Sequence, residues 1–190
     1  RECQPGIYST SIFGIRYFSL NERFNFLSTG TTDVYNDAGD LLYSVNGTGT
    51  YDIKTTNDLL GLQFGLEMTY RHCLWGWGAE AKVCPSINMS RQRTRVISSV
   101  THPGDPFSDT LDESRFGLSD DLALVGDVSL LAYYKVRPHI TLRASWDMMW
   151  LVGVALAPEQ LQWATDPAPR VNNNGTVFYQ GVSLGIEWTR

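Results

Sequence analysis

The stretch at residues 139–157, HITLRASWDMMWLVGVALA, constrains the fold most, because its hydrophobicity alternates with a period of two. Apolar residues fill every even position from 140 to 156, and the odd positions between them are polar or small apart from Met149 and Leu151. Successive side chains of a β-strand point to opposite faces. A helix would pair Arg143 with Asp147 favourably but would scatter the apolar residues around its circumference. The pattern therefore predicts a long strand with one apolar and one polar face.

The same alternation recurs along the chain, and it predicts further strands at about 7–20, 60–70, 75–89, 122–134 and 178–188. The connections alternate between tight turns, at 72–74 and 137–138, and long polar stretches near 21–58, 90–118 and 157–175. Short turns at one end and long loops at the other are typical of an outer-membrane β-barrel. We therefore expect residues 1–190 to form one all-β, antiparallel up-and-down transmembrane barrel domain with three long extracellular loops. The first loop should contain a ribbon that turns at residues 36–40.

Soluble barrels and sandwiches also alternate, with the apolar face inward, so strand length and aromatic placement bear on the choice. Several predicted strands run to roughly 12–16 residues, longer than the usual soluble strand of about 5–6. Large aromatic residues on the apolar face gather near the predicted strand ends, as in the aromatic girdles of membrane proteins. The predicted lipid-facing aromatic residues are Tyr70, Trp75, Trp77, Tyr134, Trp146, Trp150, Phe178 and Trp188.

The opposite, polar face carries both signs of charge deep within the predicted strands. The residues that we expect to line a lumen are Arg16, Glu67, Glu80, Lys82, Asp127, Arg143, Asp147 and Glu187. They could form a charged constriction that selects solutes. Alternatively, they could form a neutralising network that fills a narrow lumen, since small barrels fill their interiors with side chains.

Composition excludes several other functions. The net charge of -5 disfavours nucleic acid as a partner, because phosphate binding needs a basic surface. No run of about 18 apolar residues is long enough for a transmembrane helix. His72 and His139 belong to the short-turn end and His102 to a long loop, so no catalytic triad can assemble and we expect no enzyme activity. No signal peptide is visible in this sequence.

Three scattered cysteines, an odd number without a CxxC motif, do not supply a zinc site. We expect no metal and no cofactor. Cys3 precedes the first strand and Cys73 lies in a short turn, so a Cys3–Cys73 disulfide is predicted at the periplasmic side. Cys84 should face the lumen, either unpaired or bonded elsewhere.

Two segments suggest partners. Residues 179–188, YQGVSLGIEW, resemble the C-terminal signal that outer-membrane barrels present to their insertion machinery. Arg91, Arg93 and Arg95 alternate with Gln92 and Thr94, and they could meet anionic lipopolysaccharide or a neighbouring subunit, or simply extend a solvated strand.

Three segments resemble a family of β-barrel porins found in planctomycete bacteria: FGIRYFSLNERF at 13–24, YDIKTTNDLLGLQFG at 51–65, and the strand at 139–157 continuing to Gln160. The resemblance implies an outer-membrane barrel and brings no catalytic residues. Family members are longer than this chain, and single-chain barrels begin at about eight strands. We expect a fragment; a missed strand pair within 21–58, or several chains sharing one barrel as a homo-oligomer, are the alternatives.

The predicted function is porin-like passive passage of small solutes across the bacterial outer membrane, with outer-membrane lipid as the surrounding partner. The alternative is a non-conducting barrel that anchors or joins a cell-surface assembly. A third alternative is a soluble barrel that binds an apolar ligand.

Overall fold

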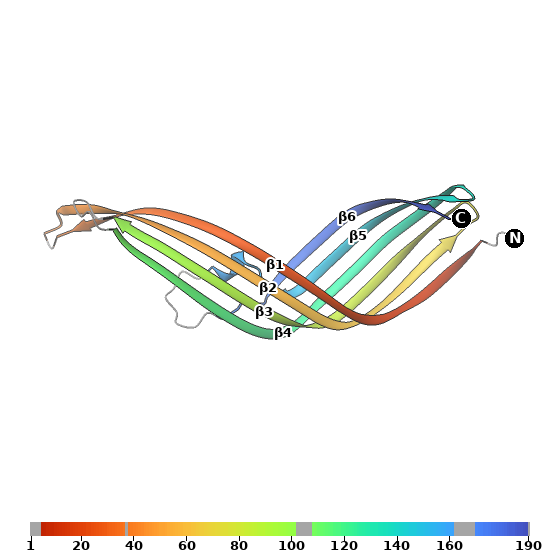
Figure 1. Ribbon diagram of the computed structural model, residues 1–190, viewed down its shortest axis with the longest axis horizontal. Helices are drawn as coiled ribbons and strands as arrows, with labels where there is room; N and C mark the ends of the chain where they lie inside the picture. Colours follow the sequence, from red (N-terminus) through yellow and green to blue (C-terminus); the bar gives the residue numbers. More distant parts are fainter. Residues whose placement is uncertain (1–4, 37, 102–107, 162–169, 190) are drawn as a thin grey trace.

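The chain folds into a single antiparallel sheet of six strands, in a computed structural model that describes residues 5–36, 38–101, 108–161 and 170–189. Each strand pairs with the next along the chain, which gives the up-and-down order β1-β2-β3-β4-β5-β6 (Figure 1). The strands are β1 (Gly6–Tyr35), β2 (Leu41–Arg71), β3 (Trp75–Thr101), β4 (Ser108–Arg137), β5 (Ile140–Val154) and β6 (Gly175–Trp188), with one 3-10 turn, η1 (Pro158–Gln160). In these ranges no helix is both long and apolar enough to cross a membrane.

The first four strands are about twice as long as the predicted ones, because they continue into regions that were expected to be loops. β1 and β2 pair without a register shift from Gly6↔Arg71 to Val34↔Tyr43, and β3 and β4 pair from Trp75↔Tyr134 to Thr101↔Ser108. The long stretches near 21–58 and 90–118 are therefore mostly paired strands, and β2–β3 pairing from Asn46↔Thr101 to Gly61↔Ser86 joins them into one four-stranded sheet. Alternating Thr, Val, Ile and aromatic residues favour strand there even without a continuous apolar face.

The ribbon of the first long stretch turns at residues 36–40, as the sequence predicts. The side-chain oxygen of Asn36 accepts hydrogen bonds from the backbone N–H groups of Ala38, at 3.0 Å, and Asp40, at 2.8 Å. Gly39 has a φ of 87°, a conformation that glycine adopts without strain. This Asx-type turn joins β1 to β2 at the far end of the molecule.

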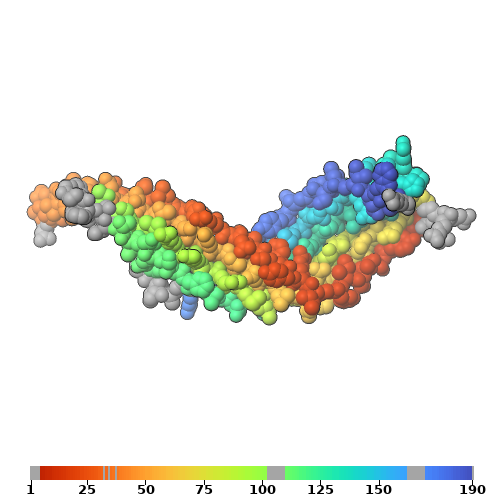
Figure 2. All heavy atoms as spheres, in the orientation of Figure 1, coloured from red at the N-terminus to blue at the C-terminus, as the bar shows by residue number. Residues whose placement is uncertain are grey.

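The sheet bends sharply near the middle of its long strands (Figures 1 and 2). Pairing between β2 and β3 is interrupted between Gly61↔Ser86 and Phe64↔Val83, where Pro85 has no N–H to donate. A Cβ on Gly61 would lie 2.2 Å from the carbonyl oxygen of Pro85, so only glycine allows this close approach. The bend separates an inner half of six strands, at the short-turn end, from an outer half built by β1–β4.

The two faces of the sheet differ as the alternation predicts: the apolar face is exposed, and the polar face, which we call the enclosed face, is mostly shielded along β2–β4 and more open on the edge strands β1 and β6. Along β3 the even-numbered residues from Gly76 to Thr94 are shielded, while most odd-numbered residues are exposed. Leucines on the outward face remain open, with Leu122 80% and Leu184 81% exposed. This inversion of the usual soluble arrangement is expected where lipid, and not water, covers the outer face.

Candidate functional site: the enclosed polar face

All eight charged residues predicted to line a lumen lie on the enclosed face. Continuous register aligns them across neighbouring strands, for example Lys82 of β3 opposite Asp127 of β4. The same register places Glu67 opposite Glu80, at the next level toward the short turns. Strand parity and register together therefore gather residues from β1 to β6 on one surface.

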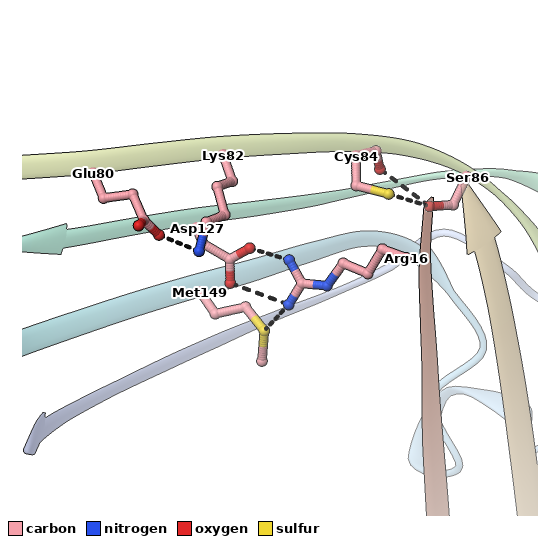
Figure 3. A network of polar contacts seen from close by, with 7 residues as sticks. All are labelled: Arg16, Glu80, Lys82, Cys84, Ser86, Asp127 and Met149. Carbon is pink, nitrogen blue, oxygen red and sulfur yellow. Dashed lines mark hydrogen bonds and ion pairs between the residues drawn. The ribbon is translucent and has the colours of Figure 1, made fainter. Parts of the chain in front are cut away.

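An ion pair between Arg16 and Asp127 shows how strongly this surface curves. Arg16 belongs to β1 and Asp127 to β4, three strands away, yet their side chains pair directly (Figure 3). Neighbouring strands are about 4.8 Å apart, so in a flat sheet these backbones would be roughly 14 Å apart. Arg16 also lies 3.8 Å from the sulfur of Met149 on β5. The sheet is therefore rolled, and Arg16 reaches across its concave side.

Every other predicted lumen residue also has a polar partner on this face. Lys82 forms an ion pair with Glu80, its neighbour two residues away on β3 (Figure 3). Arg143 pairs with Glu187 of β6, at 2.5 Å, and not with Asp147. Asp147 accepts hydrogen bonds from Ser145, at 2.8 Å, and Ser183, at 3.0 Å. Glu67 accepts one from Thr69 at 2.8 Å. The charges largely neutralise one another within the enclosed face.

A hollow of about 670 Å³ opens on this face at the short-turn end. Its lining includes Glu67, Arg143 and Glu187, together with two cations that the sequence analysis did not single out, Arg71 and Lys135. Both share the parity of predicted lumen residues on their own strands, which is the signal that could have identified them. The hollow is large enough for several water molecules or a small hydrophilic solute, since one water takes up about 30 Å³ of liquid volume.

An apolar layer follows the charged network, at the level of the bend. It is built by inward-facing side chains of β2 to β5, with Phe18 and Leu20 of β1 packed against it. Its buried members are Leu59, Cys84, Ala123, Val125, Leu151 and Val154. The enclosed face is therefore not polar along its whole length.

The segment after β5 folds back across the enclosed face. We call its described residues, 155–161 and 170–174, the strap. The buried amide of Asn57 on β2 pairs with Ala155 twice, donating to its carbonyl at 2.9 Å and accepting from its N–H at 2.7 Å. Asn88 of β3 donates to Asn57 at 3.0 Å and to the carbonyl of Gly153 at 2.9 Å. These bonds hold the start of the strap over β2 and β3.

The strap is fixed at further points. Glu22 of β1 accepts a hydrogen bond from the N–H of Ala157 at 3.0 Å. The buried side chain of Gln160 donates to the carbonyl of Asn172 at 2.7 Å and accepts from its N–H at 2.9 Å, which joins the two parts of the strap. Asn173 accepts from Ser90 of β3 at 2.9 Å. The stretch near 157–175, expected as an extracellular loop, thus lies partly against the interior of the sheet.

The predicted lipid-facing aromatic residues all have outward parity. Six are well exposed: Trp75, Trp77, Tyr134, Trp146, Phe178 and Trp188. Tyr70 contacts both Trp75 and Trp77, with ring centroids 5.5 and 6.4 Å apart. The ring of Trp150 lies over Gly126, where a Cβ would come within 2.2 Å of it.

Cys73 is disulfide-bonded, whereas Cys84 is a free, buried thiol on the enclosed face, 3.4 Å from the hydroxyl of Ser86. Cys3, the predicted partner of Cys73, lies outside the described residues. His72 and His139 lie at the short-turn end, and His102 also lies outside the described residues. Among the residues that the structure describes, no group of three or more His, Cys, Asp or Glu side chains could hold a metal ion.

In a comparison with protein families, a family model described as "Putative beta barrel porin-7 (BBP7)" matches residues 5–189. Comparison with curated proteins and with solved structures finds no match.

Proposed function

The chain belongs to the β-barrel porin family described as Putative beta barrel porin-7, and from this premise we propose that it carries small solutes passively across the bacterial outer membrane. The enclosed polar face carries this proposal. A sheet whose apolar face is open and whose charged face is shielded has its free energy minimum where lipid lies outside and water inside. No chemical step is required of the protein, and we expect no catalysis.

Strand dimensions support a membrane-spanning inner half. β5 and β6, with 15 and 14 residues, exceed the roughly 9–11 residues that a tilted strand needs to span a bilayer. On β2 the outward apolar residues run from Leu60 to Tyr70, about 33 Å at 3.3 Å per residue. A tilt of about 45° reduces this to roughly 23 Å, close to the apolar band of outer-membrane barrels, about 25 Å tall.

The interior suggests a graded route. A solute from the short-turn end would enter the charged hollow, pass the Arg16–Asp127 pair, and then meet the apolar layer and the strap. Paired charges give weak selection by sign, whereas an apolar layer restricts passage by dewetting. We therefore propose that the strap and the apolar layer, and not the charges, set the narrowest point.

Planar-bilayer recording of the full-length protein tests this function. We expect discrete conductance steps with modest preference for either ion sign. Asn57→Ala should raise the conductance, because it removes both hydrogen bonds to Ala155 and frees the strap. Asn46→Ala, at an exposed position of the same strand, is the matched control and should leave it unchanged. A folded, inserted protein without any conductance would refute the proposal.

One observation favours a second candidate, a non-conducting anchor for a cell-surface assembly. The outer half of β1–β4 continues well past the apolar band as paired strands. Shortening the outer ends of the β1–β2 and β3–β4 hairpins by equal numbers of residues on each strand distinguishes the porin from the anchor. A porin keeps its conductance after this change, whereas an anchor loses retention of its surface partners and has no conductance to lose.

A further inference from the structure

The outward face changes character just beyond the apolar band. Tyr17, Leu60, Ile87 and Leu122 form the last entirely apolar row across β1–β4. Three rows further out, Arg23, Lys54 and Arg93 stand directly opposite one another on β1, β2 and β3. Cross-strand partners share a face, so these three cations point to the same side as the apolar band. We call Arg23, Lys54 and Arg93 the basic row.

Like charges directly opposite one another on neighbouring strands destabilise a sheet. Among the described residues, Arg23 alone of the three is bonded to a carboxylate: it donates two hydrogen bonds to Asp52, at 2.8 and 2.9 Å. Lys54 and Arg93 are exposed and have no ion pair within the described part of the chain. One carboxylate therefore serves three cations, which leaves the row with a net charge of about +2 in a chain whose own net charge is -5.

The rows on either side of the basic row also carry an arginine on β3, but each of these arginines is paired with a carboxylate. Arg91 donates to Asp58 at 2.6 Å, and Arg95 donates to Asp112 at 2.9 and 2.6 Å. The fourth strand contributes exposed apolar residues beside these cations, Phe116 and Leu118. Cations next to apolar side chains suit the boundary between acyl chains and headgroups.

The basic row lies a short way above the headgroup layer. Arg93 lies six residues beyond Ile87, about 20 Å along the strand and about 14 Å along the membrane normal at a 45° tilt. The headgroup region extends about 5–8 Å beyond the hydrocarbon on each side. Long arginine and lysine side chains can bend back toward it, which brings the basic row within reach.

From these observations we propose that the basic row binds the phosphate group of an anionic lipid in the leaflet at the long-ribbon end. The occupant is a lipid and not a free anion, because the row continues the lipid-facing surface and has exposed leucine and phenylalanine beside it. Bound phosphate replaces like-charge repulsion by charge-assisted hydrogen bonds. The proposal rests on the assignment of the apolar face to lipid, which is part of the proposed function.

Native mass spectrometry of the full chain tests this binding. The protein is released from vesicles of phosphatidylcholine with and without phosphatidic acid, a phosphomonoester lipid, and retained lipids are counted. We expect Arg93→Gln and Lys54→Gln each to weaken retention of phosphatidic acid about five-fold, in line with the usual contribution of one cation near an anionic surface. Phosphatidylcholine retention should not change.

Arg115→Gln is the charge-matched control, because Arg115 lies opposite Thr94 and so faces the enclosed side at nearly the same level. It should leave phosphatidic acid retention unchanged. Equal retention by wild type, Arg93→Gln and Lys54→Gln would overturn the proposal, and so would displacement of the lipid by millimolar inorganic phosphate. Either result leaves conductance unaffected, so failure of the lipid site is distinguishable from failure of the porin function.

Discussion

Leu130 and Leu131 are adjacent, identical residues on opposite faces of β4, and they allow a matched test of which face meets lipid. Leu130 is opposite Ala79 and Trp146 on the outward face and is 45% exposed. Leu131 is opposite Gly78 and Ser145 and lines the charged hollow. Replacing each leucine by arginine changes volume and charge equally, so any difference reports the environment alone.

The expected costs differ because an arginine on the lipid-facing side of a strand destabilises the barrel. It lowers the free energy of unfolding by about 2–4 kcal/mol at the bilayer midplane and by about 0–1 kcal/mol near the interfaces. Leu130 lies close to the middle of the apolar run that extends from Leu122 to Tyr134. We expect Leu130→Arg to cost about 2 kcal/mol or more, a factor of about 30 in the folding equilibrium. Leu131→Arg enters a polar hollow beside Glu67 and should cost no more than about 1 kcal/mol, the lost partial burial of one leucine.

Urea unfolding in phospholipid vesicles measures this difference, with heat-modifiable gel mobility as the test for the folded barrel. Equal free energies of unfolding for the two variants would refute the assignment of faces. A larger loss for Leu131→Arg would reverse it.

Three further predictions concern packing, the strap and pH. Gly126→Ala should lower the free energy of unfolding by about 1–3 kcal/mol in thermal melts, because the new Cβ would meet the Trp150 ring; Gly181→Ala, which has nothing within 4 Å, should be neutral. Asn57→Ala should cost about 1–3 kcal/mol, because it leaves two backbone groups of Ala155 unsatisfied, and hydrogen exchange should rise at Ala155 but not in β1; unchanged exchange at Ala155 contradicts the strap's anchoring. Hydrogen bonds from Arg23 lower the pKa of Asp52, and this effect outweighs the opposing effect of partial burial. The stability that the Arg23–Asp52 pair contributes is therefore complete above about pH 4, and it is lost as the pH falls through the lowered pKa of Asp52. Exchange in the β1–β2 ribbon, corrected for intrinsic rates, should rise only below about pH 4, and Asp52→Asn should abolish that step.

Much of the fold could be predicted from the sequence, because period-two alternation is a property of strand geometry. In β5 the parity of Trp146 and Asp147 fixes which side chain lies on the outward face of the sheet. Pro85 and Gly61, which create the bend, carried no clear signal, since their effect depends on the register between two strands. The strand extensions were missed because neither of their faces carries a continuous run of apolar residues, so their sequences resemble loops.

The contacts on the enclosed face were less predictable, because they join side chains that are far apart in the sequence. Parity places Arg16 and Asp127 on the polar face, but only the curvature of the sheet brings them together. The strap was not foreseeable, since Asn57 and Asn88 look like other polar strand residues and their partners lie far along the chain. The basic row could be predicted only in part. The sequence singles out Arg93, between Arg91 and Arg95, whereas the register between β2 and β3 is needed to place Lys54 opposite it.

Site-directed thiol labelling tests most directly whether the enclosed polar face lines a watery passage. Cys84 is first replaced by serine, and cysteine is then placed at Ser145, which lines the hollow, or at its outward-facing neighbour Trp146. In reconstituted membranes, a charged, water-soluble thiol reagent should modify Ser145→Cys, lowering the conductance, and should spare Trp146→Cys. Modification of Trp146→Cys with protection of Ser145→Cys, or modification of Ser145→Cys without any change in current, would contradict the account.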